Sequence, residues 1–177
     1  MAISTYVAVP TLAVGDKLTA SRWNTIGTAL GFLLNPPEAV ATNTASTSIL
    51  NNTLTTIPFA TETKDTGGTW DGAMHDNVTN NSRVTITTTG TYQVSARISW
   101  TANATGRRTM QLNKNGTGID SIGIANPGAS DPAICYHSAE YNLTAGDYLE
   151  IQGIQTSGGA LTLTANGTYL QARLIGS

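Results

Sequence analysis

The stretch that decides the fold is Tyr92-Gln93-Val94-Ser95-Ala96-Arg97-Ile98-Ser99-Trp100, which follows a turn at Gly90. Apolar and polar residues alternate along it, so an extended chain would place them on opposite sides. A period of two predicts a β-strand that is buried on one side. The residues on its apolar side are Tyr92, Val94, Ala96, Ile98 and Trp100.

Working outward, further short strands are expected on both sides of this one. Turn residues separate them, most clearly Asn115-Gly116 and Ser157-Gly158-Gly159. No helical pattern interrupts the series, which favours an antiparallel sandwich or barrel. The expected strands are residues 53–59, 82–87, 92–100, 109–113, 117–124, 133–143, 148–154, 160–164 and 168–174.

The first 40 residues differ from the rest. Thr19 suits the N-cap of a helix, and Pro36-Pro37 would end it, which predicts a helix over residues 20–34. A lone helix of this length is marginal in water, so its apolar stripe needs a cover. We expect residues 1–40 to be an attachment or trimerisation element. The candidate partner-binding residues are Trp23, Ile26, Leu30, Phe32, Leu33 and Leu34.

Small polar residues fill positions 38–48 and are interpreted as a linker or an extended arm. The expected organisation is therefore an N-terminal arm and helix over 1–40, a linker over 41–48, and a β domain over 49–177.

The composition excludes several classes of protein. Only 11% of the 177 residues are charged and the formal net charge is -2, so neither nucleic-acid binding nor an acidic tail is expected. No apolar run approaches the length that spans a bilayer, and the N-terminus lacks the pattern of a secretory signal. Thr is abundant, with 30 residues, and a surface rich in hydroxyls suits a protein exposed on a particle. One cysteine, Cys135, excludes an intrachain disulfide and indicates synthesis in a reducing cytoplasm.

The landmarks over about residues 52–175 are Ile57-Pro58-Phe59, Asp65, Trp70 to His75, Ser82 to Ile86, Gly90 to Val94, Trp100, Asn103, Gly106-Arg107-Arg108, Asn115-Gly116, Ala145 to Ile151 and Gln155 to Gly159. Their order and spacing resemble the C1q/TNF-type jelly roll, in the form found in phage structural proteins. The N-terminal segment contains Gly15-Asp16-Lys17-Leu18-Thr19-Ala20-Ser21-Arg22-Trp23-Asn24, and its helix ends in Asn35-Pro36-Pro37. This segment is similar to the N-termini of phage head-decoration and tail-fibre-like proteins.

The resemblance implies an all-β, C1q/TNF-like antiparallel jelly-roll sandwich preceded by an N-terminal arm and one short α-helix. It also implies a homotrimer whose subunits pack around a three-fold axis through one sheet. The sequence does not assign the face that forms the axis.

Few residues suggest catalysis or metal binding. Cys135 lies in a strand pattern, which favours a buried core residue over a reactive thiol. His75 and His137 lack ligand-spaced partners. The acidic residues that could bind calcium are more typical of turns and caps. They are Asp65, Asp71, Asp76 and Asp120.

The basic and aromatic residues also have competing interpretations. Arg107 and Arg108 point to opposite faces of a strand, so a solvated face or an inter-subunit ion pair is favoured over a basic patch with Arg83 and Arg97. Trp70 and Trp100 are expected in the core or between subunits, with a sugar-stacking platform as the alternative.

These observations lead to one expected function and one alternative. The first is a phage virion structural protein, a trimeric capsid decoration or minor capsid protein on the virion surface, assembled in the bacterial host cytoplasm. Its partner would be the major capsid protein lattice, or another virion protein, through the N-terminal segment. The alternative is a tail-fibre tip or receptor-binding protein that recognises a host surface glycan or protein. No catalytic activity, cofactor, metal, nucleic acid or membrane partner is expected.

Overall fold

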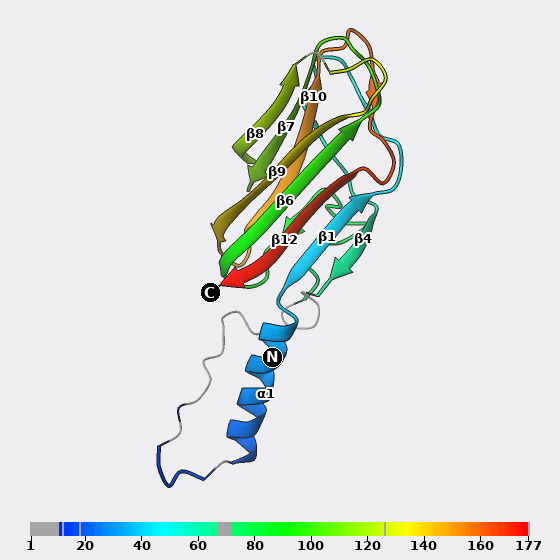
Figure 1. Ribbon diagram of the computed structural model, residues 1–177. Helices are drawn as coiled ribbons and strands as arrows, with labels where there is room; N and C mark the ends of the chain where they lie inside the picture. Colours follow the sequence, from blue (N-terminus) through cyan, green and yellow to red (C-terminus); the bar gives the residue numbers. More distant parts are fainter. Residues whose placement is uncertain (1–10, 12, 18, 67–71, 126, 177) are drawn as a thin grey trace.

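Two antiparallel sheets face each other, and one helix extends from one end of this sandwich (Figure 1). The computed structural model describes residues 11, 13–17, 19–66, 72–125 and 127–176. The expected all-β sandwich preceded by a short helix is confirmed. The elements are α1 (Ala20–Leu34), β1 (Glu38–Asn43), β2 (Ser48–Ile49), β3 (Thr55–Thr56), β4 (Thr61–Asp65), β5 (Val84–Thr85), β6 (Gly90–Trp100), β7 (Arg107–Lys114), β8 (Thr117–Ala125), β9 (Ala133–Leu143), β10 (Tyr148–Gln155), β11 (Leu161–Thr162) and β12 (Thr168–Gly176).

The two sheets differ in order. The first runs β4-β1-β12-β6-β9 and is the nearer layer in Figure 1. The second runs β3-β10-β7-β8, with β5 also paired to β10, and lies behind it. A short pair, β2 and β11, covers one end. The core fills the space between the two sheets.

Strand β6 lies inside the first sheet, between β12 and β9. As its alternation predicts, Tyr92, Val94, Ala96, Ile98 and Trp100 are all fully buried. Alternate residues of one strand point to one face, so a single local pattern supplies five side chains of the core.

The hairpin between β7 and β8 has the turn that its sequence predicts. Asn115 and Gly116 both have positive φ angles, 52° and 78°. Asn and Gly tolerate this left-handed conformation, and the resulting turn matches the twist of the two strands.

The predicted linker is wrong where it overlaps β1. Residues 38–43 form this strand, which pairs with β12 on one side and β4 on the other. Ala39 and Ala41 are fully buried beneath the sheet. The β domain therefore begins at Glu38 rather than at residue 49. The side chains of residues 38–43 are mostly small and show no clear alternation of apolar and polar types, so the sequence did not predict this strand. Their burial depends on β12 and β4, which are distant in the sequence.

Three expected strands are much shorter than predicted, over 53–59, 82–87 and 160–164. In the first, Pro58 has no N–H to donate to a ladder, so regular pairing stops at Thr56. Ile57 and Phe59 are still fully buried. Their N–H groups donate to Ile151 O at 3.0 Å and Asn81 O at 2.8 Å.

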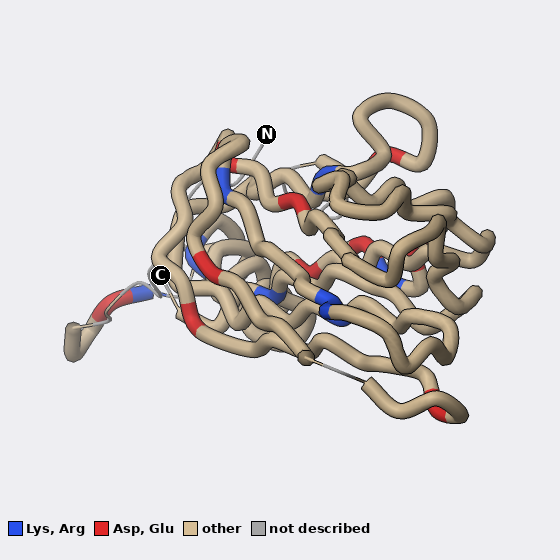
Figure 2. The backbone as a smooth tube through the Cα atoms, turned by 90° about the horizontal axis from the view of Figure 1, so that it is seen from above, with Lys and Arg blue, Asp and Glu red and all other residues tan. Residues whose placement is uncertain are grey.

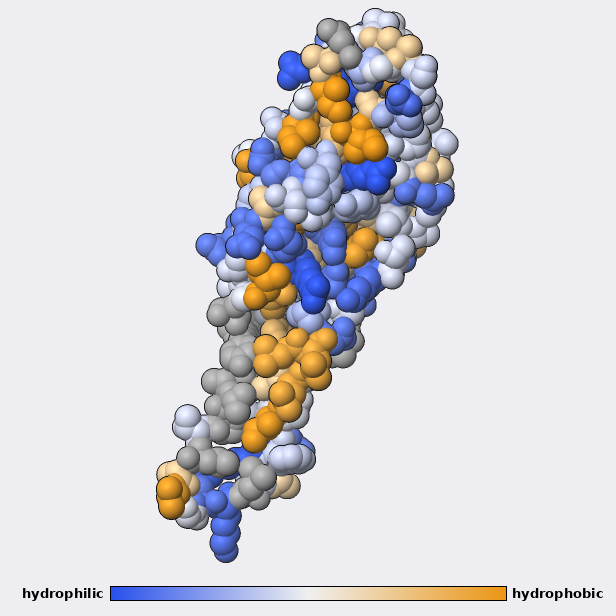
Figure 3. Space-filling view, viewed as in Figure 1, coloured by the Kyte–Doolittle hydropathy of each residue, from blue (hydrophilic) through white to orange (hydrophobic). Residues whose placement is uncertain are grey.

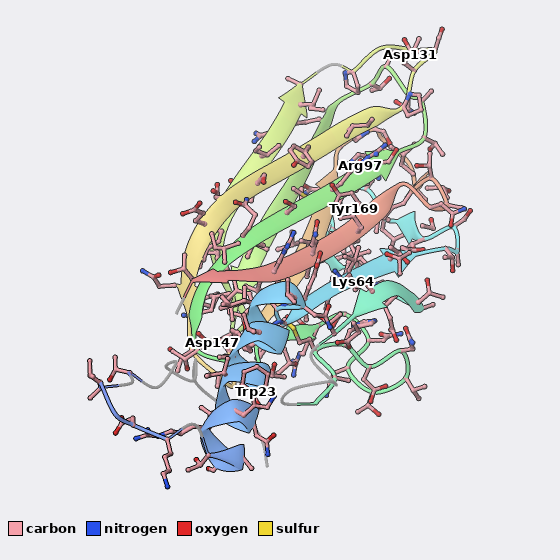
Figure 4. The ribbon with its side chains drawn as sticks, turned by 60° about the horizontal axis from the view of Figure 1, so that its bottom comes forward. Trp23, Lys64, Arg97, Asp131, Asp147 and Tyr169 are labelled. Atoms are coloured by element: carbon pink, nitrogen blue, oxygen red, sulfur yellow. The ribbon has the colours of Figure 1, made fainter. Side chains whose placement is uncertain are left out.

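The turn at Asp147 connects β9 to β10 and lies near the α1 end of the sandwich (Figure 4). Its carboxylate accepts from Asn115 Nδ2 at 2.7 Å and Thr144 N at 2.8 Å, and pairs with Lys114 Nζ at 2.8 Å. Burial alone would raise the pKa of Asp147, but these donors outweigh it and lower the pKa to about 2.

We expect Asp147→Asn to lower the free energy of unfolding by about 1–2 kcal/mol at pH 7. Because the pKa is depressed in the folded state, the carboxylate stabilises the fold above its unfolded value of 3.8, and this is lost as pH falls toward about 2. Urea unfolding of the wild type and the variant at pH 7 and near pH 2 measures the difference in stability at each pH. A difference between wild type and variant that does not shrink at low pH would contradict this account.

Candidate partner-binding site

Helix α1 covers the predicted range, and its ends are fixed by the expected residues. At the start, Thr19 Oγ1 accepts from Arg22 N at 3.3 Å, and Arg22 pairs with Asp16 at 3.0 Å. At the end, Asn35 N donates to Gly31 O at 2.9 Å, and two prolines follow. The helix thus stops directly before β1, so its orientation depends on the short connection at residues 35–37.

Most of the predicted partner-binding residues lie together on the uncovered side of α1. Their exposed fractions are 62% for Trp23, 51% for Leu30, 58% for Leu33 and 84% for Leu34. Ile26 lies beside them and is half-buried. We call these five residues the helix stripe. Figure 3 shows apolar residues gathered over α1, and Figure 4 shows Trp23 on the helix.

Phe32 does not belong to this surface. It is 6% exposed and packs into the core of the sandwich. Its inclusion among the partner-binding residues is therefore corrected. It lies on the side of α1 that meets the β domain, a distinction that the spacing of apolar residues alone did not make.

A hollow of about 480 Å³ lies where α1 meets the end of β12. Its walls are mainly apolar, with Phe32, Leu33 and Pro36 on one side and Leu174 and Ile175 on the other. It continues from the C-terminal end of the helix stripe, because Leu33 belongs to both.

A second apolar surface lies on the outer face of the first sheet. Tyr169, Arg97 and Tyr136 are directly opposite one another on β12, β6 and β9. Tyr136 is 49% exposed, and Ile134, two residues along β9, is 43% exposed. We call these four residues the sheet face. Figure 4 shows Arg97 and Tyr169 side by side.

The centre of the sheet face is short of hydrogen-bond partners. Arg97 Nε is buried and has no partner among the described residues. Burial and the neighbouring Tyr136 raise the pKa of Tyr169, while Arg97 acts in the opposite direction. The sequence reasoning missed this surface. The outward positions of 133–143 and 168–174 carried the signal, but the pairing of the strands was needed to join them.

The same sheet becomes polar toward α1. Glu38 is 5% exposed, and its carboxylate accepts from Lys64 Nζ at 2.6 Å and Gln171 Nε2 at 2.7 Å. One strand pair further along, Gln93 Nε2 donates to Ser138 Oγ at 2.8 Å. The apolar sheet face is therefore bordered by a satisfied polar network.

The expected interpretation of Cys135 is confirmed. It is fully buried, and burial raises the pKa of its thiol, which disfavours the reactive thiolate.

Acidic residues have structural roles where the structure describes them. Asp65 accepts from Met74 N and His75 N, and Asp76 accepts from Val78 N and Thr79 N. Asp120 instead lies on β8, 3.5 Å from His137 Nδ1. Asp71 and Trp70 lie outside the described residues. Within the described part of the chain, no three His, Cys, Asp or Glu side chains gather as metal ligands, and no helix could cross a membrane.

The arginines do not form one basic surface, and Figure 2 shows Lys and Arg interspersed with Asp and Glu. Arg83 pairs with Glu150 of the same chain at 3.0 Å. The prediction of a solvated or inter-subunit role is wrong for Arg108, which is fully buried. Its guanidinium donates to the carbonyls of Asn103, Thr105 and Arg107. Trp100 is also fully buried, as expected for a core residue, so it cannot stack on a sugar.

Comparison with solved structures identifies the fold as TNF/C1q-like. Murine APRIL is 15% identical, with a TM-score of 0.57, and the match covers 78% of this chain and 98% of that one. The Eiger TNF of S. frugiperda is 14% identical, with a TM-score of 0.55 and coverage of 80% and 95%. The globular domain of zebrafish complement 1qA is 13% identical, with a TM-score of 0.53 and coverage of 78% and 97%. At these identities the likeness concerns the fold alone. No family model and no curated protein matches the sequence.

Proposed function

We propose that this chain is a phage virion structural protein, a trimeric capsid decoration protein that attaches to the assembled head through its N-terminal segment. The observation that carries the proposal is the helix stripe on a helix that projects from the sandwich. Large apolar side chains left in water at one end of a well-packed domain indicate a surface that is covered in the assembled state.

The proposed trimer uses the sheet face as its three-fold contact. Tyr136, Tyr169 and Ile134 provide apolar area on the outer face of the first sheet, and Arg97 Nε has no partner among the residues that the structure describes. A neighbouring copy packed there would cover the aromatic rings and offer acceptors to the guanidinium. The polar network around Glu38 would form the rim of this contact.

Attachment would be mechanical rather than catalytic. A trimer that binds the assembled lattice but not its free subunits stabilises the lattice by mass action. The low charge of the chain would limit nonspecific contacts on the exterior.

Immunogold electron microscopy of the parent virions tests the location. Antibody raised to residues 49–177 is expected to label the whole head. Label confined to the tail tip would contradict decoration and favour the receptor-binding alternative. That alternative has lost one of its supports, because Trp100 is buried.

We expect Leu30→Glu to reduce the occupancy of purified protein on undecorated heads by roughly tenfold or more, because it places a charge in an apolar surface that is covered in the assembled state. Co-sedimentation with heads measures the occupancy. Ser21→Glu is the matched control, since Ser21 is exposed on the opposite side of α1. Equal binding by the two variants would show that the stripe is not covered on the head.

A further inference from the structure

We propose that the helix stripe is covered by the same stripe of neighbouring copies, so that the α1 helices of the assembly form a parallel bundle. This inference deepens the proposed function and rests on the trimer described there. It assigns the helix stripe to contacts between copies, so that the N-terminal segment would meet the head as an assembled bundle.

The spacing of the stripe is that of a helix seam that packs on its own kind. Trp23, Ile26, Leu30 and Leu33 follow one another at steps of three, four and three. This is the a/d pattern of a coiled coil over two heptads. Trp23, Leu30 and Leu33 are exposed and Ile26 is half-buried, whereas Ala29 and Phe32, outside the pattern, are buried. The chain therefore leaves the seam free and covers the neighbouring side.

The charges of α1 also suit a contact between identical surfaces. Arg22 is the one charged residue between Ala20 and Leu34, and Asp16 already neutralises it at 3.0 Å. Copies related by rotation bring like residues together, so a charged seam would repel itself. An uncharged seam has no such cost.

The connection to the sheet fixes the direction of the helix. Thr66 Oγ1 donates to Pro36 O at 2.7 Å and accepts from Glu38 N at 3.0 Å, and Leu174 N donates to Pro37 O at 2.9 Å. Pro36 and Pro37 also restrict the backbone of this connection, residues 35–37. A rotation that brings sheet faces together would therefore carry the helices with it.

The helix stripe and the sheet face also point to the same side of the molecule. Figure 3 views the outer face of the first sheet, and the apolar residues over α1 face the viewer in that same view. A single axis beside this side of the molecule can therefore serve both surfaces.

The exposed area of the helix stripe indicates that a stable contact between copies needs the sheet face as well. The exposed fractions of the stripe side chains correspond to roughly 500 Å² per copy, against roughly 800 Å² per partner in a standard interface. Two heptads alone would not hold copies together. The sheet face supplies the remaining area.

Cross-linking of the purified full-length chain, without any phage particle, tests the bundle. Ile26→Cys places a thiol in the seam, and Ser21→Cys is the matched control on the opposite side of α1. Cys135 stays in place, because it is fully buried in the folded protein. A short bismaleimide is expected to join Ile26→Cys copies into covalent dimers on a denaturing gel, at a yield that does not change on dilution. The Ser21→Cys copies are expected to remain single.

Equal cross-linking of the two variants, or none at Ile26→Cys, would overturn the inference. A second measurement covers a poorly folding cysteine variant: Leu30→Glu is expected to weaken self-association at least tenfold in sedimentation equilibrium. An unchanged association constant would also overturn the inference and would leave the stripe to a particle protein. The outcome is separable from the proposed function, because labelling of heads can succeed or fail whichever result these solution measurements give.

Discussion

Trp100→Ala is expected to lower the free energy of unfolding by about 3–5 kcal/mol, the range for removal of a fully buried aromatic side chain. Trp100 ends β6, opposite Ala133 of β9, and is fully buried between the sheets. Its ring packs so closely on β10 that a Cβ at Gly153 would lie 3.1 Å from it. Neighbours this tightly packed cannot close the cavity, so the loss includes both the transfer of the ring and the void.

The test is urea unfolding followed by far-UV circular dichroism, which does not depend on tryptophan fluorescence. Val78→Ala is the control: truncation of an apolar residue that is 87% exposed and lies outside both proposed contacts should change the stability of the sandwich by less than about 0.5 kcal/mol. If both variants lose the same stability, Trp100 does not have the role in the core that is assigned to it here.

Gly106→Ala is expected to cost about 3 kcal/mol or more, since two penalties fall on one residue. Gly106 has a φ angle of +74°, which disfavours any side chain. In addition, its Cβ would overlap the backbone carbonyl of Thr156. That backbone cannot move freely, because Thr156 N donates to Arg107 O at 3.1 Å and Arg107 N donates to Thr156 Oγ1 at 2.9 Å.

Gly158→Ala separates the two penalties. Gly158 has a similar φ angle of +92° but open space where the Cβ would be. It should cost about 1–2 kcal/mol, the strain of the left-handed conformation alone. Thermal unfolding of both variants measures the difference. A Gly158→Ala variant as unstable as Gly106→Ala would mean that the overlap with Thr156 contributes nothing.

The elements that the sequence predicted well are those whose signals are local. Helix α1 has its cap at Thr19, its terminating prolines and its apolar spacing within one short segment. Strands β6 and β9 carry a period of two or clear turn residues at their ends. Each of these can be recognised before any long-range contact forms, so the range 20–34 and the inward face of β6 were correct.

The errors concern residues whose environment is set by distant partners. Glu38 is buried because Lys64 and Gln171 reach its carboxylate from β4 and β12. Arg108 is buried because the loop before it turns three carbonyls inward. The sheet face joins β6, β9 and β12 through pairings that a single sequence does not reveal. For the candidate site, spacing found the helix stripe, but it could not distinguish Phe32 from its neighbours.

The placement of α1 and of the end of β12 has a consequence for the insertion of foreign peptides. Helix α1 and the end of β12 lie at one end of the sandwich, and the loop that carries Asp131 lies at the other (Figure 4). Foreign peptides inserted beside Asp131 would stand clear of the proposed helix bundle. The molecule thus has α1 at one end and an exposed loop at the other, which is the layout wanted in a scaffold for displaying antigens.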